Sequence, residues 1–245
     1  MIDVKLNMQA SIFVNLMDIG PTPEYITLFV KEFADLGFLP STVQEIGETG
    51  SLTRLSLKTH DNGWLIVLGS NRLDIIQSST DSKGLNILSE EDFVRRALEY
   101  YGKIDKHFTR KANRVALSSG FLLSKLDSTE LDKIYTKLNN PINTYLVNKP
   151  DEWNNRVSSI LYKEINGIQE KVNFISQISR VKGVIRELSG FQNFDRIELK
   201  FDLNTHQDNV NSRFDAVGIT DYFSKVVSWN NQIKEEILDF LASKP

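Results

Sequence analysis

The chain contains no cysteine, so it has no disulfide bonds, no thiolate metal ligands and no thiol nucleophile. This absence fits a reducing compartment, and we expect a cytoplasmic protein. Apolar runs are short as well: "WLIVL" at 64–68 is far below the ~20 residues that a membrane-spanning helix needs. The amino terminus also lacks the pattern of a signal peptide. We therefore expect a soluble protein without a membrane partner.

Histidine is scarce, and the three histidines, His60, His107 and His206, each lack a second histidine three or four residues away. No local zinc motif exists, since such motifs place ligands at that spacing. No glycine cluster has the spacing of a phosphate-binding or dinucleotide-binding loop, and no G-x-S-x-G motif marks a serine nucleophile. We therefore expect no metal site and no cofactor, and no motif indicates an enzyme.

Net charge is −3, with both signs interspersed along the chain, so the whole molecule has no basic footprint for nucleic acid. The densest basic stretch is "KIDKHFTRKANR" at 103–114. Its cations are Lys103, Lys106, Arg110, Lys111 and Arg114. A solvated helix end and linker is the simplest interpretation. A nucleic-acid contact through these five residues stays open as the alternative.

The first part of the chain combines the two-residue periodicity of strands with the 3.6-residue periodicity of helices. A strand is predicted from Val4 to Leu16 and a helix from Thr22, whose hydroxyl can cap the free amides ahead of Pro23. Four short alternating segments follow, separated by turn residues such as Asn62-Gly63. These segments are "TVQEI", "LTRLSLKT", "GWLIVLGS" and "RLDIIQSS". A second helix is predicted from Ser89, so the order is strand, helix, four strands, helix.

The second part of the chain is predicted to repeat this order. A strand at 113–126 and a helix at 127–141 come first, and a long amphipathic helix capped by Thr220 comes last. Between them lie four strand candidates, at 156–165, 170–180, 182–188 and 195–204.

These patterns predict an α+β fold made of two β-α-β-β-β-β-α halves, residues 1–110 and 111–245, packed as one unit. An antiparallel meander leaves one face bare, and amphipathic helices of the same unit can cover it. Two such halves can join edge to edge into one long sheet. The element order resembles that of helix-grip and TATA-binding-protein-like folds.

The segment "FDRIELKFDLNTH" at 194–206 holds the best polar constellation of the sequence. In a strand, Asp202, Asn204 and His206 line one face, with Glu198 and Lys200 before them, while Ile197 to Leu203 line the other. The row is typical of an ordinary strand with one wet face. Asp202 and His206 remain the candidates for a catalytic role.

Two tryptophans are candidates for a protein interface. Trp153 lies in the polar segment "KPDEWNNR", and Trp229 lies beside the apolar stripe of the last helix. Tryptophan is enriched at binding hot spots, although each ring can equally anchor its own segment.

The order of elements also resembles a sporadically distributed, uncharacterised bacterial family of about this length. Its members carry a strand of the form R-x-G-L-R-Y-x-N after a helix, and the corresponding stretch here is "RVALSSGF" at 114–121. Arg114 and Leu117 fit that pattern, whereas the Arg-Tyr pair and the asparagine are replaced. The resemblance implies an accessory protein of mobile or antiviral-defence loci, and it carries no catalytic residues.

We expect a non-enzymatic binding or scaffold component of a multi-protein bacterial system, with another protein or a second copy as its partner. A nucleic-acid-binding module that uses residues 103–114 is the first alternative. An enzyme with a site between the two halves is the second.

Overall fold

The computed structural model describes residues 1–47, 50–187 and 190–243. Its first half has the predicted order of strand, helix, four strands and helix. The elements are β1 (Ile2–Phe13), α1 (Pro23–Phe33), a short 3-10 helix (Ala34–Leu36), β2 (Phe38–Gly47), β3 (Gly50–Thr59), β4 (Trp64–Leu68), β5 (Leu73–Ser78) and α2 (Glu90–Asp105). The α+β prediction is confirmed, and the antiparallel meander follows the alternating segments read from the sequence.

The second half departs from the prediction in its strand count. Its elements are β6 (Arg114–Leu123), α3 (Ser128–Asn139), α4 (Asn143–Val147), β7 (Trp153–Ile165), β8 (Ile168–Glu187), β9 (Gly190–Thr205) and α5 (Ala216–Ala242). The candidates at 170–180 and 182–188 are one strand, β8, as far as Glu187, while residue 188 lies outside the described residues. The predicted break was wrong because Arg180 stays in the ladder and forms a bidentate ion pair with Asp195 of β9, at 2.9 and 2.8 Å.

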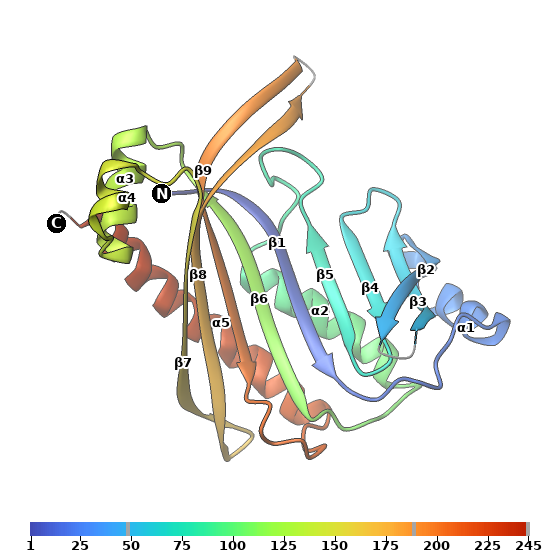
Figure 1. The fold of residues 1–245 in the computed structure, drawn as a ribbon. Coiled ribbons are helices and arrows are strands. Elements are labelled where there is room, and N and C mark those ends of the chain that lie inside the picture. Colours follow the sequence, from blue (N-terminus) through green and yellow to red (C-terminus); the bar gives the residue numbers. More distant parts are fainter. Residues whose placement is uncertain (48–49, 188–189, 244–245) are drawn as a thin grey trace.

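All nine strands form one antiparallel sheet in the order β2-β3-β4-β5-β1-β6-β9-β8-β7. The first strands of the two halves, β1 and β6, lie side by side at its centre, so the halves join edge to edge (Figure 1). Beyond Val181 and Arg196, the described parts of β8 and β9 pair with each other alone and project past the rest of the sheet (Figure 1).

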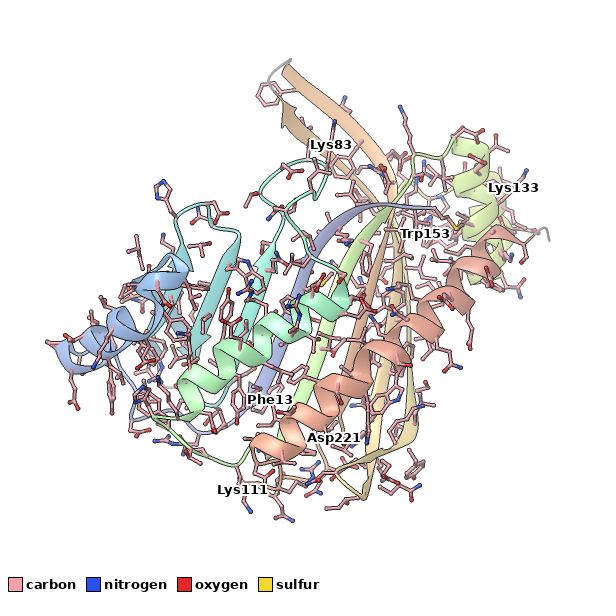
Figure 2. The ribbon with its side chains drawn as sticks, turned by 180° about the vertical axis from the view of Figure 1, so that it is seen from behind. Phe13, Lys83, Lys111, Lys133, Trp153 and Asp221 are labelled. Atoms are coloured by element: carbon pink, nitrogen blue, oxygen red, sulfur yellow. The ribbon has the colours of Figure 1, made fainter. Side chains whose placement is uncertain are left out.

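Helices α2 and α5 lie against the same face of the sheet (Figure 2). Apolar side chains at alternate strand positions fill the space beneath them, because alternate residues of a strand point to one face. These include Met8, Ala10 and Ile12 of β1, Leu117 of β6, and Ile197, Leu199, Phe201 and Leu203 of β9. The predicted core-facing row of β9 is therefore confirmed.

A polar cluster bridges the halves within this helix layer. Glu90, at the start of α2, accepts a hydrogen bond from Asn230 Nδ2 of α5 at 3.0 Å and pairs with Lys234 Nζ at 3.1 Å. Asn230 Nδ2 also lies 3.3 Å from the Ser119 hydroxyl of β6. Buried polar groups need such partners, so the cluster joins α2, α5 and the sheet at one point.

Helix starts follow local capping chemistry. Thr22 caps α1 ahead of Pro23, as predicted, with Tyr25 N–H donating to its hydroxyl at 3.4 Å. The last helix begins earlier than predicted: Asp215, not Thr220, caps α5 by accepting from Gly218 N–H at 3.0 Å. Thr220 lies within the first turns, where its hydroxyl donates to the Ala216 carbonyl. Within the described residues, no helix has the length and apolar character needed to cross a membrane.

Candidate functional site

The side of the sheet opposite α2 and α5 is the open face, because no helix of the described chain lies over it (Figure 1). Its side chains occupy the strand positions that alternate with the core residues. At its centre lie Asp74 and Ile76 of β5, Gln9, Ser11 and Phe13 of β1, Arg114, Ala116 and Ser118 of β6, Lys200, Asp202 and Asn204 of β9, and Asn173, Ile175 and Gln177 of β8.

One end of the open face carries an aromatic ring between two guanidinium groups, the Arg72–Phe13–Arg114 row. Arg114 stands directly opposite Phe13 in the β1–β6 register, and its guanidinium carbon lies 3.9 Å from the ring centroid. Arg72, on the β5 side of β1, lies 5.6 Å from the same centroid. Phe13 lies at the last position of β1 (Figure 2). Cations over an aromatic face are attracted by its quadrupole, so the row holds two positive charges at a fixed spacing.

Arg72 and Arg114 differ in their counter-charges. Arg72 Nε donates to Asp74 at 2.7 Å, whereas Arg114 forms no ion pair within the described chain and its Nε is buried without a hydrogen-bond partner. Burial lowers the pKa of Arg114 from its ordinary value, Asp202 opposes this shift and Arg72 adds to it. The group keeps its charge at neutral pH, since even a shifted arginine titrates far above it. Arg114 is thus a charged, partly buried donor that no carboxylate of the described chain neutralises by contact.

Asp74 holds the Arg72–Phe13–Arg114 row in place through its contact with Arg72. It is 5% exposed and accepts hydrogen bonds from the Ser11 hydroxyl at 2.6 Å and from Gln9 Nε2 at 3.0 Å, besides the bond from Arg72. A carboxylate with this many donors is held in one orientation, and it positions Arg72 in turn.

A hollow of about 410 Å³ opens in the same end of the open face. Its lining includes Phe13, Val43, Glu45, Val67, Arg72 and Asp74. Apolar walls with a few fixed charges are typical of places where a side chain of a partner inserts. The Phe13 ring separates this hollow from Arg114, so an apolar group and an acidic group can be held next to each other.

The predicted polar row of β9 lies on the open face, but its members belong to three separate groups. Lys200 Nζ pairs with the Glu198 carboxylate at 2.9 Å. Asn173 donates to Asn204 at 3.1 Å and Asn204 donates to Asp202 at 3.0 Å, a ladder that braces β8 against β9. His206 lies beyond the end of the strand, where its Nδ1 is 3.2 Å from the Asp208 carboxylate and accepts from the Asp208 N–H. No hydrogen bond or ion pair of the described residues joins Asp202 to His206. The catalytic role of these two residues stays a prediction.

The structure spreads the predicted nucleic-acid residues over several surfaces. These residues are Lys103, Lys106, Arg110, Lys111 and Arg114. Lys103 donates to the Glu32 carbonyl at 2.9 Å and Lys106 pairs with the Glu32 carboxylate at 2.5 Å, so both hold the end of α1. Arg110 pairs with Asp18 through both oxygens, at 2.8 and 2.6 Å. Lys111 is exposed, and Arg114 lies on the open face. Three of the five cations are therefore engaged in joining segments of the chain.

Both predicted interface tryptophans pack against the core in this structure. The Trp153 ring lies 5.9 Å from the Tyr135 ring of α3, and the Trp229 ring lies 6.2 Å from the Tyr222 ring. Lys163 of β7 lies 5.3 Å from the Trp229 ring centroid. Each tryptophan therefore anchors its own segment, and its contact with a partner stays a prediction.

Sequence reasoning missed Phe13 and Arg72. A signal was present for Phe13, since it follows the core positions Met8, Ala10 and Ile12 but falls in register with the polar Gln9 and Ser11. An aromatic residue in the polar row of a strand is an exception to alternation. Arg72 had no comparable signal, because its place depends on the β1–β5 register.

Within the described ranges, no three histidine or acidic side chains come close enough to share a metal ion. Comparison of the chain with protein-family models, curated proteins and solved structures finds no match. The bacterial family resemblance accordingly stays a prediction.

Proposed function

We propose that this protein is a non-enzymatic binding component that holds a partner protein on its open face. The observation that carries the proposal is Arg114, a charged donor stacked on Phe13 beside the hollow and without an ion pair in the described chain. A guanidinium presents a fork of donors that fits a carboxylate. The partner segment that suits this arrangement offers an aspartate, a glutamate or a chain-terminal carboxylate next to an apolar side chain.

The mixed charge of the open face favours a protein over a nucleic acid. Carboxylates of Asp74 and Asp202 are interleaved with the guanidinium groups of Arg72 and Arg114. A phosphate backbone is repelled by such carboxylates, whereas a protein surface carries both signs. The setting in a multi-protein bacterial system, antiviral defence included, is proposed together with the family resemblance.

Site-specific photo-crosslinking tests where a partner binds. A crosslinker at the exposed Lys200, on the open face, is compared with one at the exposed Ser228 on α5. The proposal expects a crosslinked protein from the native bacterial host at position 200 and none at position 228. Equal crosslinking at both positions, or crosslinking at 228 alone, would contradict it.

Affinity for the crosslinked partner then tests the residue that carries the proposal. Arg114→Glu should weaken binding by roughly ten- to a hundredfold, the size of a lost hydrogen bond to a charged group. Arg95→Glu is the matched control, since Arg95 is an exposed arginine of α2, on the opposite side of the sheet. Unchanged affinity of the Arg114 variant refutes the role given to Arg114.

A nucleic acid is the second candidate, favoured by two guanidinium groups on one face. In that case binding at low salt falls steeply as salt rises, and Arg114→Glu weakens it. Lys106→Glu provides the contrast, because Lys106 is paired with Glu32 at the end of α1. The third candidate, an enzyme, has least support, since Asp202 and His206 lie in separate networks.

A further inference from the structure

Strand β7 is one edge of the sheet, and its turn determines which of its backbone groups face outwards. Asn166 and Gly167 connect it to β8 with φ of 49° and 75°, the geometry of a two-residue hairpin turn. Such a turn closes on a hydrogen-bonded pair, here Ile165 and Ile168. Hydrogen-bonded and non-hydrogen-bonded residue pairs alternate along an antiparallel ladder. The odd-numbered residues of β7 are therefore bonded to β8, and the even-numbered ones direct N–H and C=O to the outer edge.

The outward residues of β7 are Asn154, Arg156, Ser158, Ile160, Tyr162 and Glu164, and the last five form the row considered below. One contact agrees with this assignment: the Glu164 carbonyl accepts from Lys225 Nζ of α5 at 3.2 Å, so it does not point only towards β8. Even-numbered residues also place their side chains on the open face, since Arg156 is in register with Gln177 and Gln177 with Lys200. One row of residues thus supplies both the free edge and the side chains beside it.

This edge lacks two of the devices that usually prevent strand pairing, a bulge and a proline, although it carries charged side chains. Its register with β8 is continuous from Trp153 to Ile165, without a bulge, and it contains no proline. Ile160 is 48% exposed and Tyr162 is 60% exposed. The opposite edge strand, β2, carries Pro40, which lacks the N–H that a new strand would need.

We propose that β7 pairs with β7 of a second copy of this chain, antiparallel, with Ile160 on the two-fold axis. In this register a residue that precedes Ile160 by a given number of positions faces the residue of the second copy that follows Ile160 by the same number. Arg156 therefore stands opposite the partner's Glu164, and Ser158 stands opposite the partner's Tyr162. Each of these outward residues exchanges both backbone hydrogen bonds with its opposite number. The Glu164 carbonyl, whose oxygen has two lone pairs, then accepts from the partner's Arg156 N–H besides Lys225 Nζ. The axis is perpendicular to the sheet, and the two open faces lie on the same side.

Charge complementarity selects a second copy as the occupant. Arg156 and Glu164 are both exposed, and neither side chain has an ion pair within the described chain. The proposed register brings them together twice, once on each side of the axis, as an isologous interface requires. A shift of two residues in either direction separates the two charges, so it loses both ion pairs.

Sedimentation equilibrium of charge-reversal variants tests the interface. The wild-type chain should be a dimer that dissociates on dilution. Arg156→Glu and Glu164→Arg, alone, should each raise the dissociation constant by about tenfold or more, because two attractions become two repulsions. The double variant should restore it, since it exchanges the partners of each pair. Lys111→Glu, at an exposed cation away from β7, should leave it unchanged.

Hydrogen exchange supplies a second readout that does not depend on a variant. Raising the protein concentration should slow exchange at the amides of the even residues 156 to 164 and leave the odd ones as they were, since those are already bonded to β8. A wild-type chain that remains monomeric overturns the proposal. A double variant as weak as the single ones, or protection that does not alternate, also overturns it.

Discussion

Two neighbouring asparagines on α5 allow the effect of burial on one kind of contact to be measured. Asn230 Nδ2 donates to Glu90 Oε1 at 3.0 Å, and Asn231 Nδ2 donates to Glu91 Oε1 at 3.1 Å. Donor, acceptor and the pair of helices are the same in both cases. Asn230 is 1% exposed, whereas the bond from Asn231 is exposed to solvent. We expect the two alanine substitutions to differ by about 2 kcal/mol in the free energy of unfolding.

The magnitude follows from the environment of Glu90. Glu90 Oε2 is already buried without a hydrogen-bond partner, and Asn230→Ala leaves Lys234 as the carboxylate's remaining donor among the described contacts. Loss of a hydrogen bond to a buried charged group costs about 1.5–3 kcal/mol. The gain in helix propensity from asparagine to alanine returns roughly 0.6 kcal/mol. The net expectation is a loss of about 2 kcal/mol, or roughly 4–8 °C in Tm for a chain of this size.

Asn231→Ala removes two contacts, because Asn231 also accepts from Lys234 at 2.7 Å. The exposed contact with Glu91 contributes about 0–1 kcal/mol, and Lys234 keeps its ion pair with Glu90 when the part-buried contact with Asn231 is lost. The same gain in helix propensity offsets these losses. We expect a change within about 0.5 kcal/mol of zero. Urea denaturation of both variants measures the difference. Equal free energies of unfolding would refute the reasoning that burial, rather than the contact itself, sets the magnitude.

Three further substitutions test the loops at Gly84 and Asp18 and the helix position Gly102. Gly84→Ala should destabilise the chain by about 3 kcal/mol, because Gly84 has φ +66° and an added Cβ would collide with the Lys5 carbonyl. Gly102→Ala, in helix α2 with open space around it, should instead stabilise the chain by roughly 0.5–1 kcal/mol in the same denaturation assay. Hydrogen bonds from Arg110 lower the pKa of Asp18 to about 2, so the ion pair contributes fully above the ordinary value of 3.8 and is lost as the pH falls towards 2. The Tm difference between wild type and Asp18→Asn should therefore be largest above about pH 4, shrink as the pH falls through about 2 and vanish below that value in thermal scans; a difference as large at pH 2 as at pH 5 would contradict the assignment to this pair.

The parts of the fold that sequence predicts are those with local causes. The four-strand meander follows from alternation and from turn residues such as Asn62, which has φ 57°. The start of α1 follows from Thr22 and Pro23. The errors in the predicted elements have two kinds of cause. Some depend on a contact that is distant in sequence, and others on a local signal that favours a different element boundary. The sequence around Arg180 predicts the end of a strand, but Asp195 of the neighbouring strand neutralises its charge and β8 continues. Gly218 disfavours a helix locally, yet it lies in the first turn of α5, which Asp215 caps.

The candidate site could be predicted only in part, because its members meet through strand pairing. Asp202 and Asn204 were placed on a polar face by alternation alone, and the structure places them there. Phe13 and Arg114 are about a hundred residues apart in sequence, and they stack because β1 and β6 are adjacent in a register that includes bulges near the start of β1. Periodicity determines which face a residue occupies, but the neighbour across the ladder depends on topology and register.

The two proposals have a joint consequence for affinity. Pairing at β7 about an axis perpendicular to the sheet sets both Arg72–Phe13–Arg114 rows on one side of the dimer, with the helices of both copies on the other. A partner that is itself dimeric, or that carries two acidic segments, can then engage both rows at once. Its second contact becomes intramolecular, which raises the overall affinity well beyond that of one row. Arg156→Glu should therefore weaken binding of such a partner without changing the affinity of a single acidic segment, whereas Arg114→Glu should weaken both.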